Sequence, residues 1–306
     1  MGELCLAVDI GGTKMAAGLV DRSGQLSESE TVRTPKSLSS EEVWSELALL
    51  VKKVLARPGG EDAIVCGVGC GGPMSSPASG LVGTIDPAEI MVSPLNIPAW
   101  RDFPLWTRLN ELTGLPTAID NDGKALALGE GWVGAATGCG DFIAMVVSTG
   151  VGGGIVLDGR LLNGRLGNAG HIGHVVVEPS GRICECGGSG CLEAEASGTA
   201  IAKATGRTAA EASPAVVART GTLVGRAIAS VANLLDLRLA VVGGSVALGF
   251  GAPFFVAARE EVQRRARLEF ARDTKVLPAA LGSAGPLVGA GAVGWRSRLD
   301  PFSEAP

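Results

Sequence analysis

The stretch LCLAVDIGGTKMAAGLV, from Leu4 to Val20, decides the fold. Leu4 to Asp9 is an apolar run that ends in an acid, and Ala16 to Val20 is a second apolar run. The segment Gly11-Gly12-Thr13-Lys14 separates them. A P-loop or a dinucleotide-binding fingerprint joins a strand to a helix, whereas this glycine turn joins two strand-like runs. The sequence therefore predicts a hairpin of two buried strands.

A second unit of the same kind begins at Phe142. Phe142 to Val147 reads as a strand, Ser148-Thr149-Gly150-Val151-Gly152-Gly153-Gly154 as a turn, and Ile155 to Leu157 as the start of a returning strand. Two such units in one chain predict two related halves that face each other. A chain of 306 residues also exceeds a comfortable single core.

The fold class that follows is α/β with two domains. Gly is abundant (46 residues) and aromatic residues are scarce (4%), a composition typical of many tight strand-to-helix turns. We expect a small domain over 1–118 and a large domain over 119–289, with a closing helix over about 290–306 that packs back on the small domain. Helices are predicted over 40–56, 105–113, 215–235 and 260–271, strands over 63–68, 117–119 and 239–242, and an irregular loop over 74–100.

The two histidines of the chain, His171 and His174, lie just before Cys184, Cys186 and Cys191. His174 and the three cysteines supply one imidazole and three thiolates, the complement of a closed tetrahedral zinc site. Four protein ligands leave no open position, so such a zinc ion would hold a loop rather than activate water. The alternative is three buried thiols and a core histidine, and the spacing favours zinc.

The two glycine hairpins could cradle phosphates, because glycine lets backbone N–H groups approach an anion. Lys14 adds a cation to the first hairpin, and Asp9 could anchor the water shell of Mg²⁺. Each hairpin alone is more often an ordinary turn, but the pair indicates a nucleotide site. Asn121-Asp122 ends a predicted strand, where a carboxylate could accept a proton from an attacking hydroxyl. An Asx turn or helix cap explains that pair equally well.

The charge of the chain bears on its partners. A net charge of −5 argues against nucleic acid and against an anionic membrane surface. The uncharged stretch from Leu239 to Ala258 has the length of a membrane span, but its glycines and Pro253 divide it into a strand, a turn and a loop. No basic flank or cleavage site opens the chain. We therefore expect a cytoplasmic protein without a membrane partner.

At this point the whole chain resembles the ROK sugar kinases, which have the actin-like, ribonuclease H-like ATPase fold with a cleft between two domains. Asp9 to Lys14 is similar to the family's first phosphate loop, and Ser148 to Gly154 is similar to the second. The segment from Gly170 to Glu193 resembles the zinc-containing signature. Val242-Gly243-Gly244-Ser245 resembles the turn that packs near the adenosine.

The resemblance implies ATP-dependent phosphorylation of a hexose at its 6-hydroxyl, with Mg²⁺ and a structural Zn²⁺. Asp122 matches the general base and Asn121 its sugar-binding neighbour. Glu193 and His174 match sugar ligands, and His174 would also bind the zinc. Gly72 and Asn96 fall where the family's small domain lines the sugar pocket. The resemblance further implies a homodimer or homotetramer.

Two positions depart from the family pattern. His171 stands where these kinases usually have Glu, so the segment reads Gly-His-Ile-Gly-His. A neutral imidazole accepts one hydrogen bond and donates one, whereas a carboxylate accepts at both oxygens. The change could admit an amino or acylamino sugar, or it could be a neutral replacement. Gly123 and Lys124 replace a small residue and Asn; Lys124 could lower the pKa of the base or point to solvent.

Three hypotheses follow for the function. The first is a hexose kinase, with glucose by default. The second is a kinase for N-acetylmannosamine, N-acetylglucosamine or a 3-amino-glucose such as kanosamine. The third is a non-catalytic sugar-binding or regulatory ROK protein. Repressors of the family carry a DNA-binding segment before the first phosphate loop. That loop starts here at Asp9, and both hairpins are present with Asp122, so we expect a kinase.

Overall fold

The computed structural model describes residues 2–75 and 89–298, which form two compact units. Of the described residues, the first unit comprises 2–75, 89–133, 163–169 and 283–298, and the second comprises 134–162 and 170–282. The sequence places the domain boundary at 118, whereas the contacts place it after Val133. The difference arises because helix α3 (Asp122–Val133) packs on helix α9 (Gly285–Ser297).

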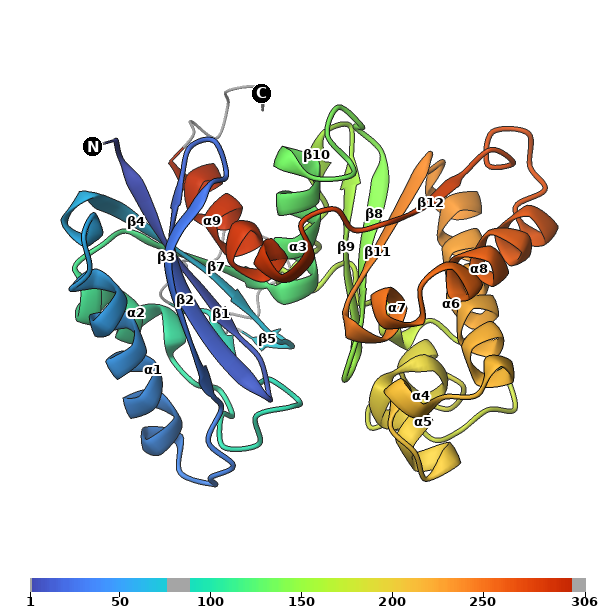
Figure 1. Cartoon of the computed structure of the whole chain (residues 1–306), viewed down its shortest axis with the longest axis horizontal. Coiled ribbons are helices and arrows are strands. Elements are labelled where there is room, and N and C mark those ends of the chain that lie inside the picture. Colours follow the sequence, from blue (N-terminus) through green and yellow to red (C-terminus); the bar gives the residue numbers. More distant parts are fainter. Residues whose placement is uncertain (1, 76–88, 299–306) are drawn as a thin grey trace. The chain divides into compact units, whose positions relative to one another are not determined.

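The first unit is built on a five-stranded sheet in the order β3-β2-β1-β4-β7. β1 runs antiparallel to β2, and β1, β4 and β7 run parallel (Figure 1). The predicted hairpin is therefore confirmed as β1–β2. The strands are β1 (Leu4–Ile10), β2 (Lys14–Asp21), β3 (Leu26–Arg33), β4 (Ala63–Cys70) and β7 (Thr117–Asn121).

The second unit repeats this design. Its five-stranded sheet has the order β10-β9-β8-β11-β12, with β8–β9 antiparallel and β8, β11 and β12 parallel. Each strand takes the same place as its counterpart in the first sheet, which confirms the prediction of two related halves. The strands are β8 (Phe142–Val147), β9 (Val151–Leu157), β10 (Arg160–Leu161), β11 (Leu239–Gly243) and β12 (Lys275–Pro278).

Helices cover both faces of the first sheet (Figure 1). Side chains alternate along a strand, so Leu6 and Val8 of β1 enter a core with α1 (Ser40–Leu55) and α2 (Leu105–Thr113). Ala7, between them, packs with Leu287 of α9 on the other face. Gly67 of β4 lets α9 come close, because a Cβ there would lie 2.0 Å from the carbonyl oxygen of Ala290.

The second unit has its own core, which joins Ile143 and Met145 of β8 to the long helix α6 and to α8. Among the described residues, only α6 is long and apolar enough to cross a membrane, and 56% of its most apolar window is buried inside the protein. This burial is typical of a core helix. The helices of the unit are α4 (Leu192–Ala196), α5 (Gly198–Thr205), α6 (Pro214–Leu235), α7 (Ser245–Phe250) and α8 (Ala252–Arg265).

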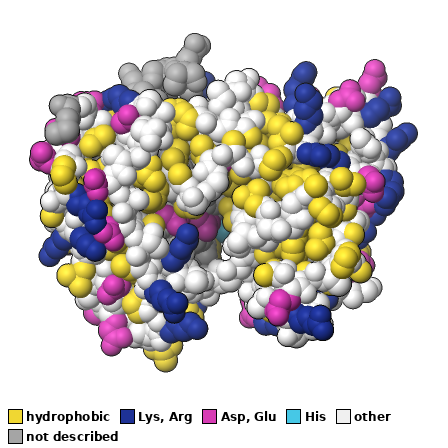
Figure 2. All heavy atoms as spheres, viewed as in Figure 1, with side chains coloured by type: hydrophobic (Ala, Val, Ile, Leu, Met, Phe, Trp, Pro, Cys, Tyr) yellow, Lys and Arg dark blue, Asp and Glu magenta, His cyan; other side chains and the backbone are white. Residues whose placement is uncertain are grey.

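The charged helix predicted over 260–271 is wrong in its bounds, because α8 begins at Ala252 and ends at Arg265. Pro253 lies in its first turn, where a missing N–H costs nothing. Arg264 and Arg265 in its last turn complement the helix dipole, and Arg264 pairs with the buried Glu261 at 2.6 Å. Figure 2 shows Lys and Arg side chains gathered around this end of the second unit.

The segment 239–258 forms β11, α7 and the start of α8. It is divided, as predicted, but the expected turn and loop are helical. Within the predicted irregular loop 74–100, two short strands pair antiparallel, β5 (Met74–Ser75) and β6 (Met91–Val92). Residues 76–88 of that loop, and 299–306 of the predicted closing helix, lie outside the described residues.

Candidate active site

Three parallel strands of the first unit end at one edge of the sheet, and the candidate residues follow from that register. Asp9 of β1 is level with Gly69 of β4, which is level with Asp120 of β7. Asn121 ends β7, and Asp122 begins α3. Ligands in α/β proteins bind beyond the carboxyl ends of such strands. The sheet therefore brings Asp9, Asn121 and Asp122 together.

Gly69 separates two of these acids, since a Cβ there would lie 3.8 Å from Asp9 Oδ1 and 3.8 Å from the Cα of Asp122. Burial and, to a smaller extent, the Asp122 charge raise the pKa of Asp9 to about 7, and the Lys14 charge opposes this shift. A bound cation would favour the ionised form of a carboxyl group in this environment. Asp9 with Asp122 therefore fits a site for Mg²⁺ carried by a nucleotide.

Asn121 and Asp122 share one backbone donor. The N–H of Gly123 lies 3.0 Å from Asn121 Oδ1 and 2.8 Å from Asp122 Oδ1. The turn expected as the alternative reading is therefore present. It does not remove the catalytic reading, because Asn121 is buried while Asp122 is exposed at the start of α3. The partial positive charge at a helix start also favours a carboxylate there.

The predicted first phosphate loop closes with a hydrogen bond from Gly11 N to Lys14 O at 3.0 Å. The hydroxyl of Thr34 donates to Gly11 O at 2.6 Å and steadies the loop from β3's side. Gly12 must lack a side chain, because a Cβ there would lie 2.5 Å from Asn96. The structure thus brings Asn96 against the loop. Gly72 belongs to the same corner, since its carbonyl accepts from Leu95 N at 3.3 Å.

Lys124 does not point to solvent, so that alternative is wrong. Only 1% of its side chain is exposed, and its Nζ lies 2.6 Å from Asp120 Oδ1. It also donates to Asn163 Oδ1 at 2.9 Å and to Gly167 O at 3.1 Å. Burial raises the pKa of Asp120, and the Lys124 charge opposes the shift.

The second hairpin joins β8 and β9 in the second unit, and its turn is shorter than predicted. Val151 to Gly154 belong to β9, and Gly152 pairs with Val146 rather than lying in the turn. Ser148, Thr149 and Gly150 remain as the turn. Gly198 N donates to Ser148 O at 2.7 Å, and the Ser148 and Ser245 hydroxyls lie 2.9 Å apart.

Gly243 ends β11 next to this turn, level with Val146. Gly244 follows with a φ of 93°, in the region that favours glycine. A Cβ on Gly244 would lie 2.4 Å from Val147 O, so the turn after β11 packs directly on the end of β8. The two predicted nucleotide segments of the second unit are therefore adjacent.

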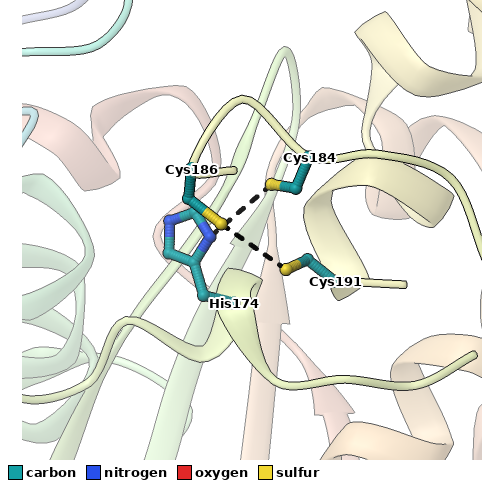
Figure 3. A group of neighbouring side chains, drawn as sticks. All are labelled: His174, Cys184, Cys186 and Cys191. Atoms are coloured by element: carbon teal, nitrogen blue, oxygen red, sulfur yellow. Dashed lines mark hydrogen bonds between the residues drawn. The ribbon is translucent and has the colours of Figure 1, made fainter. Parts of the chain in front are cut away.

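His174, Cys184, Cys186 and Cys191 point toward one another (Figure 3). Their ligand atoms all lie within 4.8 Å of one another, with Cys186 Sγ 3.7 Å from Cys191 Sγ and Cys184 Sγ 3.7 Å from His174 Nδ1. Tetrahedral zinc with ordinary bond lengths requires about 3.5 to 3.8 Å between such atoms. The four side chains fit a structural zinc ion.

The thiols of the cluster differ in their acidity. Burial raises the pKa of Cys191 to about 12, whereas a backbone hydrogen bond involving Gly188 lowers the pKa of the exposed Cys186. Three thiolates so close together repel one another unless a metal compensates their charge. Zinc would hold this loop and would supply no open coordination position.

The predicted sugar ligands of the second unit converge on Val151, the first residue of β9. Glu193 Oε2 accepts from Val151 N at 2.8 Å. The 3-10 helix Ile172–His174 packs on the same residue, because a Cβ on Gly173 would lie 2.2 Å from Val151 O. His171 caps this helix, with its ring centroid 6.0 Å from that of His174. Glu193 and both histidines thus adjoin the second phosphate loop.

The sequence reasoning missed Thr199, whose hydroxyl donates to Thr149 O at 2.9 Å. Ser245, whose hydroxyl bonds to that of Ser148, belongs to the turn that was predicted from the sequence. Ser197, which caps α5 through Ala200 N, was the available signal for a helix start at this point. Asp120 four residues before Lys124 was the signal for their ion pair.

The structure is an actin-like kinase fold, with two α/β sheets of the same strand order and a Cys3His cluster in the second unit. The chain belongs to the ROK family, whose model matches residues 5–294.

Known proteins of the family are similar over most of the chain. N-acetylmannosamine kinase of Escherichia fergusonii is 36% identical over 261 residues, 80% of this chain and 84% of that one. Glucokinase of Thermotoga maritima is 40% identical over 198 residues, 64% of this chain and 58% of that one. The crystal structure of a Streptomyces griseus ROK glucokinase with glucose and AMPPNP has a TM-score of 0.78 and 31% identity, covering 96% of this chain and 99% of that one.

Proposed function

We propose that the protein is an ATP-dependent kinase that transfers the γ-phosphate to the 6-hydroxyl of a hexose. The observation that carries this proposal is Asp122, an exposed carboxylate at the start of α3 beside Asp9 and the first phosphate loop. A positioned carboxylate of this kind accepts the proton of an attacking hydroxyl in phosphoryl transfer. The family relationship supports the same reaction.

Asp122 removes the proton from the 6-hydroxyl of the sugar as the hydroxyl oxygen forms a bond to the γ-phosphorus. The bond from that phosphorus to the bridging oxygen breaks, and ADP leaves. Asp9 and Lys14 would hold the cation and the phosphate end of the nucleotide, where Mg²⁺ would supply positive charge to offset that of the phosphates. Ser148, Thr149 and the glycines at 150, 243 and 244 supply neutral contacts to the nucleotide.

The residues proposed to bind the sugar are Glu193, His171 and His174 in the second unit and Asn121, Asn96 and Gly72 in the first. A carboxylate and amides recognise a polyol through paired hydrogen bonds, and loss of one partner strongly penalises the wrong sugar. Zinc on His174, Cys184, Cys186 and Cys191 would orient His174 and Glu193. Glu193 lies two residues after Cys191, at the start of α4.

Among hexoses, an acylamino sugar of the N-acetylmannosamine type is favoured over glucose, the default of the sequence alone. Two observations support this choice. The relatives that match 80% of the chain are N-acetylmannosamine kinases, whereas the glucokinase match covers 64%. His171 in place of the usual Glu provides one donor and one acceptor in place of a charge. Glucose remains the second candidate because the S. griseus neighbour binds it.

A panel assay tests the substrate. ADP release with MgATP is measured against glucose, N-acetylmannosamine, N-acetylglucosamine and 3-amino-glucose, for the wild type and for His171→Glu. The wild type should prefer N-acetylmannosamine, and His171→Glu should shift the kcat/KM ratio toward glucose by about 10- to 100-fold, the worth of a charged hydrogen bond. His171→Gln, which stays neutral, is the matched control.

Either of two results contradicts the proposal in part. Fast turnover of glucose with an unchanged ratio in His171→Glu would make the protein a glucokinase and His171 a neutral replacement. Turnover of no sugar would favour the non-catalytic binding protein instead. A cytoplasmic location and a homodimer or homotetramer complete the proposal, and sedimentation velocity measures the assembly.

A further inference from the structure

Lys124 is the buried cation nearest to the proposed base along the chain. Its side chain is 1% exposed, in the first turn of α3 and two residues after Asp122. An ammonium group has three N–H donors. Asp120 Oδ1, Asn163 Oδ1 and Gly167 O, at 2.6, 2.9 and 3.1 Å, use all three. The pair Asp120–Lys124 therefore spans the turn that carries Asp122.

Two of the three acceptors belong to residues 163–169, here named the crossing loop. The crossing loop belongs to the first unit, whereas the residues on either side of it, Leu162 and Gly170, belong to the second. It is closed by a hydrogen bond from Ala169 N to Asn163 O at 3.0 Å.

A second attachment holds the crossing loop to the first unit. The Asn168 side chain accepts from Met74 N at 2.9 Å and donates to Met74 O at 2.8 Å, as a neighbouring strand would. The loop is thus held by Lys124 on one side and by β5 on the other. The chain then continues through Gly170 into His171, the first of the proposed sugar ligands.

We propose that Lys124 is a positioning residue for the phosphoryl transfer. It holds the crossing loop on the turn that carries Asp122 and so fixes the position of the base. Its side chain is 1% exposed and its three donors are used, so Lys124 acts through that turn. This inference rests on the proposed function, since it takes Asp122 as the base.

The chemistry of the Asp120–Lys124 pair explains how a charged side chain can hold the crossing loop. A buried ammonium is costly unless each N–H finds an acceptor. Release of the crossing loop would leave Lys124 with one acceptor in place of three. The positive charge of Lys124 therefore favours the closed loop, and the Asp120 carboxylate neutralises that charge. Removing Lys124 alone would also leave Asp120 unpaired, so a single substitution does not separate positioning from folding.

A double variant, Asp120→Asn with Lys124→Met, separates them. It removes both charges together, and Asn168→Ala loosens the same loop without changing any charge. Arg108→Met, which breaks the exposed pair with Glu41 in the same unit, is the matched control. For each variant the melting temperature, the KM for sugar and for ATP, kcat, the pH profile and hydrogen exchange of peptide 163–169 are measured.

The double variant should exchange the amides of the crossing loop at least about 10-fold faster than the wild type. Its kcat/KM for the sugar should fall about 10- to 100-fold, as expected when a reacting group is misplaced by about 1 Å. The KM for ATP and the pH profile should stay unchanged. Asn168→Ala should act in the same direction, and Arg108→Met should change neither quantity.

Three results would overturn the inference: unchanged exchange in the crossing loop, an activity loss that only follows the melting temperature, or a shifted pH profile with a normal Asn168→Ala variant. The last result would make Lys124 an electrostatic partner of the base. The exchange measurement needs no activity, so the two proposals fail separately. A wild type that turns over no sugar would overturn the proposed function. If hydrogen exchange of its crossing loop still depended on Lys124, only the structural contact between Lys124 and the loop would stand.

Discussion

The two units share one sheet design but differ in the chemistry at their hairpins. The edge next to β1–β2 carries charged groups, with Asp9, Lys14 and Asp122 close to the turn. At the β8–β9 turn, the neutral side chains of Ser245 and Thr199 are bonded to Ser148 and Thr149, and the Glu193 carboxylate accepts from Val151 N just after the turn. Under the proposed function, the first hairpin would supply the charged groups of the reaction, and the turn of the second would contact the nucleotide through neutral groups.

The units also differ in what fixes their candidate residues. Asp9 and Asn121 lie at the ends of hydrogen-bonded strands, so the sheet itself positions them. His171 and His174 lie on a segment between β10 and α4 that has no long strand or helix, and Glu193 lies in the short helix α4 that follows it. The Cys3His cluster holds that segment. The first site should therefore survive metal loss, while the second should not.

Asp122→Asn should have the largest effect, because it removes the proposed base and keeps the size and shape of the side chain. The kcat should fall about 10²- to 10⁴-fold, the usual contribution of general base catalysis. Sugar binding, measured by calorimetry, should stay within about 2-fold of the wild type, since the proton moves only in the transition state. Glu61→Gln, at an exposed acid of the same unit, is the control. Near-normal turnover would remove Asp122 from the role of base.

Asp9→Asn should stabilise the protein at alkaline pH in the absence of nucleotide and Mg²⁺. The pKa of Asp9 is about 7 in the folded protein because of burial and the Asp122 charge, against about 3.9 for an unfolded chain. Between these values the folded state keeps a proton that the unfolded state has lost. The free energy of unfolding of the wild type therefore falls as pH rises through this window.

The variant should gain up to about 4 kcal/mol over the wild type at pH 8 and little at pH 4, as read from urea unfolding. Asp21→Asn gives the opposite sign, since hydrogen bonds from Ser23 and Gln25 lower the pKa of Asp21. The Asp21 carboxylate of the wild type stabilises the folded state above its unfolded pKa, and this contribution is lost as the pH falls into the acid range. A destabilised Asp9→Asn at pH 8 would mean that Asp9 serves the fold and not a cation.

Removal of zinc should act on the second unit. Cys191→Ser, or a chelator on the wild type, should weaken sugar binding about 10- to 100-fold, as loss of a metal's supporting groups does elsewhere. The KM for ATP should change less. Metal analysis should give about one zinc per wild-type chain and less in the variant. Cys139→Ser, at a half-buried thiol of the same unit outside the cluster, is the control. A metal-free wild type with normal sugar binding would show that the site of the second unit does not depend on zinc.

Sequence reasoning found the strands that carry strong apolar runs and missed elements whose pattern is weak. β3 (Leu26–Arg33) was missed because its residues alternate between half-buried and exposed, and most are polar. α3 was missed because Gly123, Gly129 and Gly131 lower its helix propensity, and Asn121-Asp122 reads as a turn. Both elements are stabilised by their neighbours, which a local pattern does not contain.

The candidate site was predicted in the same uneven way. The Cys3His set is local in sequence and has a fixed ligand chemistry, so its spacing sufficed. The position of Lys124 was not predictable, because two of its three acceptors come from the crossing loop, 39 and 43 residues further on. The domain boundary moved for a similar reason, since α3 packs on α9 from the other end of the chain.

Ser245→Ala should have the smallest effect and tests the neutral hairpin. The variant loses one hydrogen bond to the Ser148 hydroxyl, which contributes about 0.5 to 1.5 kcal/mol. The KM for ATP should rise about 2- to 10-fold, with kcat and the KM for sugar unchanged. Ser230→Ala, whose exposed hydroxyl donates to Arg226 O within α6, is the control. A fall in kcat without a change in the KM for ATP would mean that this turn stabilises charge in the transition state. Both hairpins would then stabilise charge in the transition state, a role that the distribution of charges assigns to the first.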